Sequence, residues 1–123
     1  MHCPQEYHWR AVKRILRYLA GTENHGLIIQ RSEHKSIIGF SDADWATDTY
    51  DRKSTTRYCI YFGANFVSWS SHKQKVISRS STEAEYRSIV AVLAKILWLT
   101  SLFQELHIST EVPKIYSDNL GAV

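Results

Sequence analysis

Three acidic residues in this sequence are each expected at the end of a regular element. Asp42 lies in the predicted strand IIGFSDAD, Asp118 ends the predicted strand KIYSD, and Glu85 lies near the start of a long predicted helix. If the fold brings them together, the carboxylates repel one another unless cations or bound protons neutralise them. Such oxygen ligands suit Mg²⁺ or Mn²⁺, and two ions about 4 Å apart support phosphodiester hydrolysis. Alternatively, Asp42 and Asp118 are simple turn residues, in SDAD and SDN.

The periodicity of the long helix, residues 80–106, distinguishes Glu85 from Glu83. At about 100° per residue, Glu85 falls on the side of an apolar stripe, whereas Glu83 points the other way. The stripe consists of Ile89, Val92, Ile96, Leu99, Phe103 and Leu106. Glu85 could instead complete a capping box with Thr82, although Ser80 and Glu83 fit the same template one step earlier.

The order of the predicted elements brings the three acids to one place. The expected elements are a helix over residues 5–20, a short strand over 27–30, strands over 37–44, 57–62 and 66–69, a helix over 80–106 and a strand over 114–118. The three middle strands are predicted to pair antiparallel, and a right-handed helical crossover returns the last strand parallel to the first. Asp42 and Asp118 would then end adjacent strands at the edge where ligands gather. The predicted class is α/β with a mixed sheet.

Length and composition are those of one folded domain. The chain has 123 residues, of which 44% are hydrophobic and 12% aromatic, which is enough for a single core. The sequence has no run of about 18 apolar residues, so no membrane span is expected, and its first ten residues lack the apolar centre of a secretory signal. Cys3 and Cys59 lack the spacing of a zinc site. We therefore expect an intracellular protein without a membrane partner.

Basic side chains are the candidates for contact with nucleic acid, although a net charge of +3 is too small to indicate such a partner. Arg52, Lys53, Lys73 and Lys75 lie in predicted loops or strand ends, where they could contact phosphates or simply be solvated. The first helix has a basic face made of Arg10, Lys13, Arg14 and Arg17. A helix-led DNA-binding module over residues 8–17 is thus a further hypothesis, and a solvated surface is the simpler interpretation.

Four motifs carry a resemblance to a known family. The strings SDADWA, DRKSTTRY, WSSHKQKVISRSSTEAEY and IYSDN, in this order, resemble the ribonuclease H domain of copia-type long-terminal-repeat retrotransposon Pol polyproteins. The opening HWRAVKRILRYLAGT resembles the segment that joins the reverse transcriptase to that domain. The resemblance implies a connection segment over residues 1–34 and a partial ribonuclease H-like domain over residues 35–123. Its partners would be an RNA–DNA hybrid and the reverse transcriptase part of the same polyprotein, in a cytoplasmic particle or the nucleus.

The resemblance also implies an activity, hydrolysis of the RNA strand of RNA–DNA hybrids with two Mg²⁺ ions, for which Mn²⁺ can substitute. In this family pattern Asp42 matches the first-strand acid that bridges the metals, Glu85 the helix acid, and Asp118 the acid that ends the fourth strand. Asp44 is a rival to Asp42 because it has the same parity along the strand. Asn119 joins the four basic residues of loops and strand ends as a candidate contact for nucleic acid.

The sequence departs from the family pattern in several places. The fourth acidic ligand of the family lies on a later helix that this chain, ending at Val123, does not reach, so metal binding and hydrolysis are expected to be impaired. Arg57 stands where the family usually has a small residue, often Gly, and Arg79 where an apolar residue is common. The alternative hypothesis is therefore a catalytically inactive remnant that serves as a nucleic-acid-binding or interaction module.

The far side of the long helix is also apolar. It carries Val90, Leu97, Trp98 and Leu102. An exposed patch of this kind predicts self-association.

Overall fold

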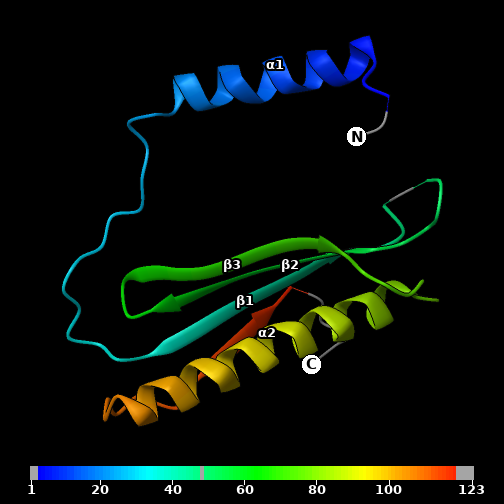
Figure 1. Ribbon diagram of the computed structural model, residues 1–123. Helices are drawn as coiled ribbons and strands as arrows, with labels where there is room; N and C mark the ends of the chain where they lie inside the picture. Colours follow the sequence, from blue (N-terminus) through cyan, green and yellow to red (C-terminus); the bar gives the residue numbers. More distant parts are fainter. Residues whose placement is uncertain (1–2, 48, 119–123) are drawn as a thin grey trace.

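The computed structural model describes residues 3–47 and 49–118. Its elements are α1 (Glu6–Gly21), β1 (Ile37–Asp44), β2 (Thr55–Phe62), β3 (Asn65–Lys73), α2 (Ser81–Glu105) and β4 (Lys114–Ser117). The strands form one sheet in the order β3-β2-β1-β4, with β4 parallel to β1 and the other pairs antiparallel. α2 lies along one face of the sheet (Figure 1). The predicted α/β class with a mixed sheet is confirmed, and the arrangement is consistent with a ribonuclease H-like fold.

The β2–β3 hairpin is longer than the sequence predicted. β2 begins earlier and β3 ends later, so that Thr55 pairs with Lys73 and Thr56 with His72. β-branched threonine favours a strand even in a polar stretch, and the predicted boundaries followed the apolar residues too closely. The turn begins at Gly63, whose φ of 56° lies in the left-handed region that glycine adopts without strain.

The prediction of a short strand over residues 27–30 is wrong, because no strand occurs there. The side chain of Asn65 satisfies the backbone of Gln30 instead: its Oδ1 accepts from the Gln30 N–H at 2.8 Å, and its Nδ2 donates to the Gln30 carbonyl at 2.9 Å. One amide side chain thus takes the place of a neighbouring strand. These two bonds attach the segment before β1 to the start of β3.

The core lies between α2 and the sheet. It is a cluster of five buried residues, Ile37, Ile60, Val92, Ile96 and Leu99, with Tyr58, Phe62, Phe103 and Ile115 packed against it. α2 approaches β1 most closely at Gly39, where an added Cβ atom would lie 2.8 Å from Cδ1 of Ile96 and 3.0 Å from Cγ2 of Val92. The absence of a side chain at position 39 therefore sets how near α2 can come to β1.

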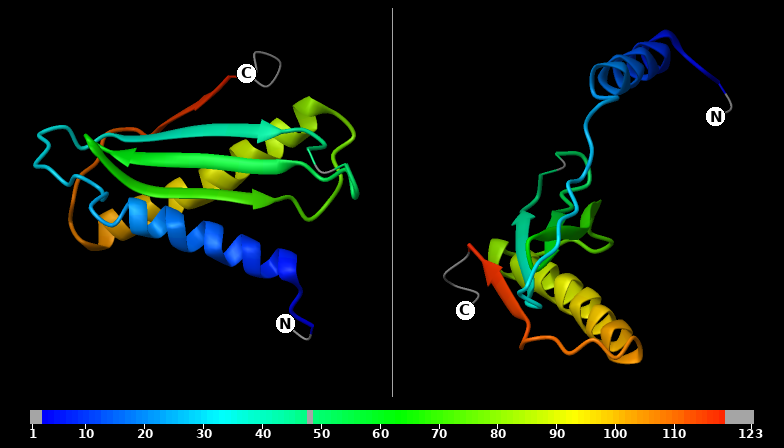
Figure 2. Two further views of the ribbon diagram at one scale, coloured as in Figure 1. Left: turned by 90° about the horizontal axis from the view of Figure 1, so that it is seen from above. Right: turned by 90° about the vertical axis from the view of Figure 1, so that its left-hand side faces the viewer.

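α1 makes no comparable contact. None of its residues is buried, and it stands clear of the sheet in Figure 1 and in the right-hand view of Figure 2. Trp9, Leu16 and Leu19, which belong to its apolar stripe, are all more than half exposed. The amphipathic pattern predicted the helix correctly, and the described residues do not cover its apolar side.

The outer side of α2 is exposed as the sequence predicted. Val90, Leu97 and Trp98 are each more than half exposed, whereas Leu102 is partly buried. Leu106, assigned above to the buried stripe, follows the helix and is exposed. By length and composition alone α2 is also able to cross a membrane, although its inner side packs on the sheet. Self-association and the absence of a membrane partner remain predictions.

We predict that Gly39→Ala lowers the free energy of unfolding by about 1–3 kcal/mol, the usual effect of overpacking a core. Ile96→Val removes the nearest atom and by itself costs about 0.5–1.5 kcal/mol. The double variant should lose less stability than the sum of the two single losses, because valine at position 96 leaves room for the new methyl group at position 39. Urea unfolding of the four proteins measures this coupling. Strict additivity would show that Gly39 does not limit the approach of α2.

Candidate metal centre

Two neighbouring strands bring Asp42 and Asp118 together. β4 runs parallel to β1 in a register that pairs Phe40 with Tyr116 and Ser41 with Ser117. Continued by one residue, this register places Asp118 beside Asp42. The two acids therefore lie at one end of the sheet, as the crossover topology predicted.

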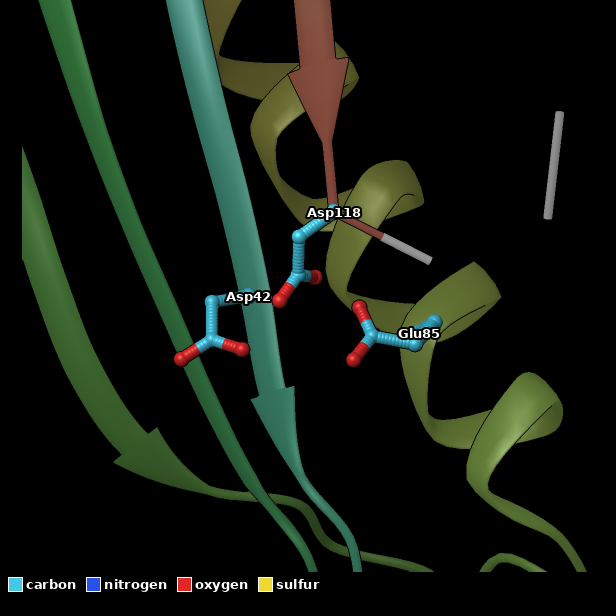
Figure 3. A group of neighbouring side chains, drawn as sticks. All are labelled: Asp42, Glu85 and Asp118. Atoms are coloured by element: carbon cyan, nitrogen blue, oxygen red, sulfur yellow. The ribbon is translucent and has the colours of Figure 1, made fainter. Parts of the chain in front are cut away.

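Glu85 reaches the same place from α2. One carboxylate oxygen from each of Asp42, Glu85 and Asp118 lies within 4.8 Å of the other two, and Figure 3 shows the three side chains pointing toward a common space. Asp44 is not in this group, so the structure selects Asp42 from the two rivals on β1. We call these three residues the acid cluster.

The start of α2 settles which glutamate caps the helix. Ser80 is the N-cap and accepts a hydrogen bond from the Glu83 N–H at 3.1 Å. The Glu83 carboxylate accepts from the backbone N–H of Arg79 at 2.8 Å and from the side chain of Arg87. Glu83 thus performs the capping role on the outer side, and Glu85 is left to point inward.

Glu85 is the most buried of the three acids, with 5% of its surface exposed. Its Oε1 accepts a hydrogen bond from the backbone N–H of Ala43 at 3.2 Å. Its Oε2 is buried and has no hydrogen-bond partner among the described residues. A buried carboxylate oxygen without a partner is costly, and a bound cation is one way to satisfy it.

Burial raises the pKa of Glu85 above its ordinary value. The hydrogen bond from Ala43 opposes this effect, while the negative charges of Asp118, Asp42 and Asp44 add to it. The shift therefore arises mainly from the removal of water, with carboxylate repulsion as a smaller contribution. Both causes would favour binding of a positive ion next to Glu85.

Ser88 fixes the geometry of the acid cluster from one helical turn further along α2. Its hydroxyl donates to the carbonyl of Asp42 at 2.7 Å and accepts from the hydroxyl of Ser41 at 2.8 Å. It is completely buried. The sequence prediction missed this residue, although its spacing of three from Glu85 places it on the same side of the helix.

Gln74 holds the beginning of α2 against the sheet. Its side-chain Nε2 donates to Thr56 Oγ1 and to the carbonyl of Ala84, both at 3.0 Å, and its Oε1 accepts from the hydroxyl of Ser78 at 3.0 Å. The sequence prediction considered only the basic neighbours of Gln74. A single buried glutamine in a polar stretch leaves no signal in hydrophobic periodicity.

Arg57 places a positive charge beside the acid cluster. It lies directly opposite Asp42 in the β1–β2 ladder, its Nη1 is 3.6 Å from Oδ2 of Asp42, and its Nη2 forms an ion pair with Asp44. About half of the Arg57 side chain is exposed. Arg57 stands where the resemblance implies a small residue, and in the structure it contacts both acids of β1.

The predicted nucleic-acid contacts lie at the same end of the sheet. Lys53 and Lys73 both pair with Asp51, at 3.7 and 3.1 Å, and Arg52 and Lys75 next to them are exposed. This end of β2 and β3 adjoins the end of β1, because Asp44 pairs with Thr55 and Thr55 with Lys73. Asn119 lies outside the described residues. The part of these side chains in binding nucleic acid remains a prediction.

Comparison with known proteins agrees with the origin suggested by the motifs. The retrovirus-related Pol polyproteins from transposons RE2 and RE1 of Arabidopsis thaliana are 50% and 52% identical over 99% of this chain. Secreted RxLR effector protein 161 of Plasmopara viticola is 43% identical over 80% of this chain and 68% of its own length. No family model and no solved structure matches the chain.

The mixed sheet and the packed helix define an α/β protein. The three acids gathered at the carboxyl ends of its parallel strands form a candidate cation site. The chain is homologous to copia-type retrotransposon Pol polyproteins, which match it at 50% and 52% identity over 99% of its length. It spans 8% of the length of each of the two Arabidopsis relatives, so it corresponds to one segment of such a polyprotein.

The raised pKa of Glu85 predicts how stability depends on pH when divalent cations are removed by a chelator. Between the ordinary pKa of a glutamate, about 4.3, and the raised folded value, the native state binds more protons than the unfolded state. Its free energy of unfolding therefore falls as pH rises through this window. We expect the free energy of unfolding of wild type to fall relative to that of Glu85→Gln as pH rises.

Glu83→Gln is the matched control. The hydrogen bonds that Glu83 accepts from Arg87 and from the Arg79 backbone lower its pKa. The free energy of unfolding of wild type should therefore rise relative to that of Glu83→Gln as pH rises. Urea unfolding from about pH 3 to about pH 8 compares the three proteins and covers both windows, that of Glu83 below the ordinary glutamate pKa and that of Glu85 above it. Parallel curves for wild type and Glu85→Gln would mean that Glu85 is not destabilised as an anion.

Proposed function

We propose that this chain is the ribonuclease H domain of a copia-type Pol polyprotein and hydrolyses the RNA strand of RNA–DNA hybrids with two Mg²⁺ ions. The observation that carries the proposal is the acid cluster, whose three carboxylate oxygens lie within 4.8 Å of one another. Homology to retrotransposon Pol polyproteins supports it, because the four motifs that resemble a ribonuclease H domain contain all three acids.

The acid cluster fits divalent cations. Oxygen ligands from carboxylates are those that Mg²⁺ and Mn²⁺ prefer. The Glu85 carboxylate lies close to the other two acids, and its buried Oε2 lacks a partner among the described residues. Asp42, Glu85 and Asp118 would together hold the ions, and Asp42 matches the first-strand acid of the family pattern. When bound, such ions activate a water molecule and stabilise the leaving oxygen in phosphodiester hydrolysis.

The chain itself would hold and orient the substrate. Ser88 would hold the backbone of Asp42, and the Ala43 N–H the carboxylate of Glu85, before substrate arrives, which spares reorganisation during the reaction. Lys53 and Lys73, at the same end of the sheet, would contact phosphates. Recognition would rest on the backbone and the 2′-hydroxyl groups of the hybrid, as is usual where proteins recognise duplex shape.

The proposed protein partner is the reverse transcriptase part of the same polyprotein. The relatives are Pol polyproteins of which this chain matches one segment. α1 corresponds to the connecting segment in the resemblance and has no buried residue. Its exposed apolar stripe would pack against that neighbouring part.

The decisive measurement is cleavage of an RNA–DNA hybrid carrying a labelled RNA strand in the presence of Mg²⁺. Asp42→Asn should lower the rate by at least about 100-fold, since loss of a ligand exceeds the 10–100-fold loss typical of outer-shell changes. Glu85→Gln and Asp118→Asn should act in the same direction. Glu83→Gln, which removes an equal charge from the outer side of α2, should leave cleavage intact.

Hybrid binding measured by fluorescence anisotropy separates the two hypotheses. The nuclease would be supported if wild type, and not the acid-cluster variants, cleaves the hybrid and leaves single-stranded RNA intact. Binding with no cleavage by wild type would overturn it in favour of an inactive nucleic-acid-binding remnant.

A further inference from the structure

The Arg57 guanidinium occupies the outer side of the acid cluster. It bridges two acids of β1, since Nη1 lies 3.6 Å from Asp42 Oδ2 and Nη2 is paired with Asp44. Its backbone pairs with that of Asp42 in the β1–β2 ladder, and its carbonyl oxygen lies 3.3 Å from the hydroxyl oxygen of Ser88. The same hydroxyl holds the carbonyl of Asp42. Arg57 is thus attached to the frame that carries the acids.

We infer that Arg57 is an internal counter-ion that competes with divalent cations for Asp42 and so sets the metal affinity of the acid cluster. The inference rests on the proposed function, in that the acid cluster must bind a divalent cation. A guanidinium beside Asp42 removes part of the negative charge that attracts the ion, and it repels a double positive charge placed a few ångströms away.

Asp44 gives the displaced guanidinium a second partner. Arg57 makes its closer ion pair with Asp44, which is not in the acid cluster. If the carboxylate of Asp42 binds a cation in place of Arg57, the guanidinium keeps Asp44 as its partner and does not have to move along the strand. The planar guanidinium suits this arrangement, because its several N–H groups can serve two carboxylates at once.

The test is binding of Mn²⁺ to the chain, measured by isothermal titration calorimetry at constant ionic strength and without nucleic acid. Arg57→Gln should bind Mn²⁺ about threefold to tenfold more tightly than wild type, the range expected when a partly exposed charge is removed beside the ligand. Arg57→Lys should show a smaller gain, since an ammonium group keeps the charge but cannot bridge both acids. The gain should shrink as salt is added.

Arg87→Gln is the matched control. It removes the same charge from an ion pair with Glu83 on the outer side of α2, 2.8 Å long and similarly exposed. Its Mn²⁺ affinity should equal that of wild type. An equal gain in Arg87→Gln would show that net charge alone is responsible, and an unchanged affinity in Arg57→Gln would also overturn the inference.

Two further comparisons keep the outcomes distinct. Thermal unfolding reports whether each variant is folded. If Arg57→Gln does not fold, Arg57→Lys becomes the test. A Mn²⁺ affinity of Arg57→Lys equal to that of wild type then counts against the inference. Adding Glu85→Gln to Arg57→Gln should abolish the tight binding. If Arg57→Gln is folded and binds no Mn²⁺ at all, the proposed metal site itself is wrong, whereas equal binding in all Arg57 variants refutes only the role of Arg57.

Discussion

The burial of the Glu85 carboxylate is the constraint on which the rest of the site depends. A carboxylate with 5% of its surface exposed and, among the described residues, a single hydrogen bond from Ala43 is unfavourable in a core unless its charge is compensated. It remains there because α2 is held from both sides of that residue. Gln74 fixes the turn before it, and the apolar contacts of Val92 and Ile96 fix the turns after it.

The close approach of α2 to β1 extends this constraint to the other acids. Gly39 leaves space for Ile96 and Val92, and at this short separation the hydroxyl of Ser88 can reach the backbone of Asp42 at 2.7 Å. A wider gap would break that hydrogen bond and draw Glu85 away from the sheet. The packing of α2 on the sheet therefore also sets the geometry of the acid cluster, and the three acids lie together without a bound ion.

The sequence was sufficient to predict the positions of the acids because each depends on a regular period. Helical periodicity distinguished Glu85 from Glu83, and the parallel crossover brought Asp42 and Asp118 to one edge. Periodicity could not separate Asp42 from Asp44, since both lie on the same face of β1. The choice between them depends on how far β4 and α2 reach along that strand.

What the sequence could not predict are the polar contacts between distant segments. The bonds of Gln74 to Thr56 and Ala84 join residues whose neighbours in sequence give no sign of burial. The error over residues 27–30 has the same origin, because Asn65 satisfies a backbone that resembled a strand. Side chains that replace backbone partners leave no pattern, so they appear only when the fold is known.

Arg57 shows how stability and metal affinity oppose each other in such a site. Without an ion, three neighbouring carboxylates repel one another, and a guanidinium beside Asp42 relieves part of that repulsion. The same charge would disfavour a divalent cation at the acid cluster. A small residue opposite Asp42 would leave the acid cluster less stable when empty and more attractive to cations. If the inference about Arg57 holds, the residue at position 57 sets the balance between a fold that tolerates an empty site and one that depends on a bound cation.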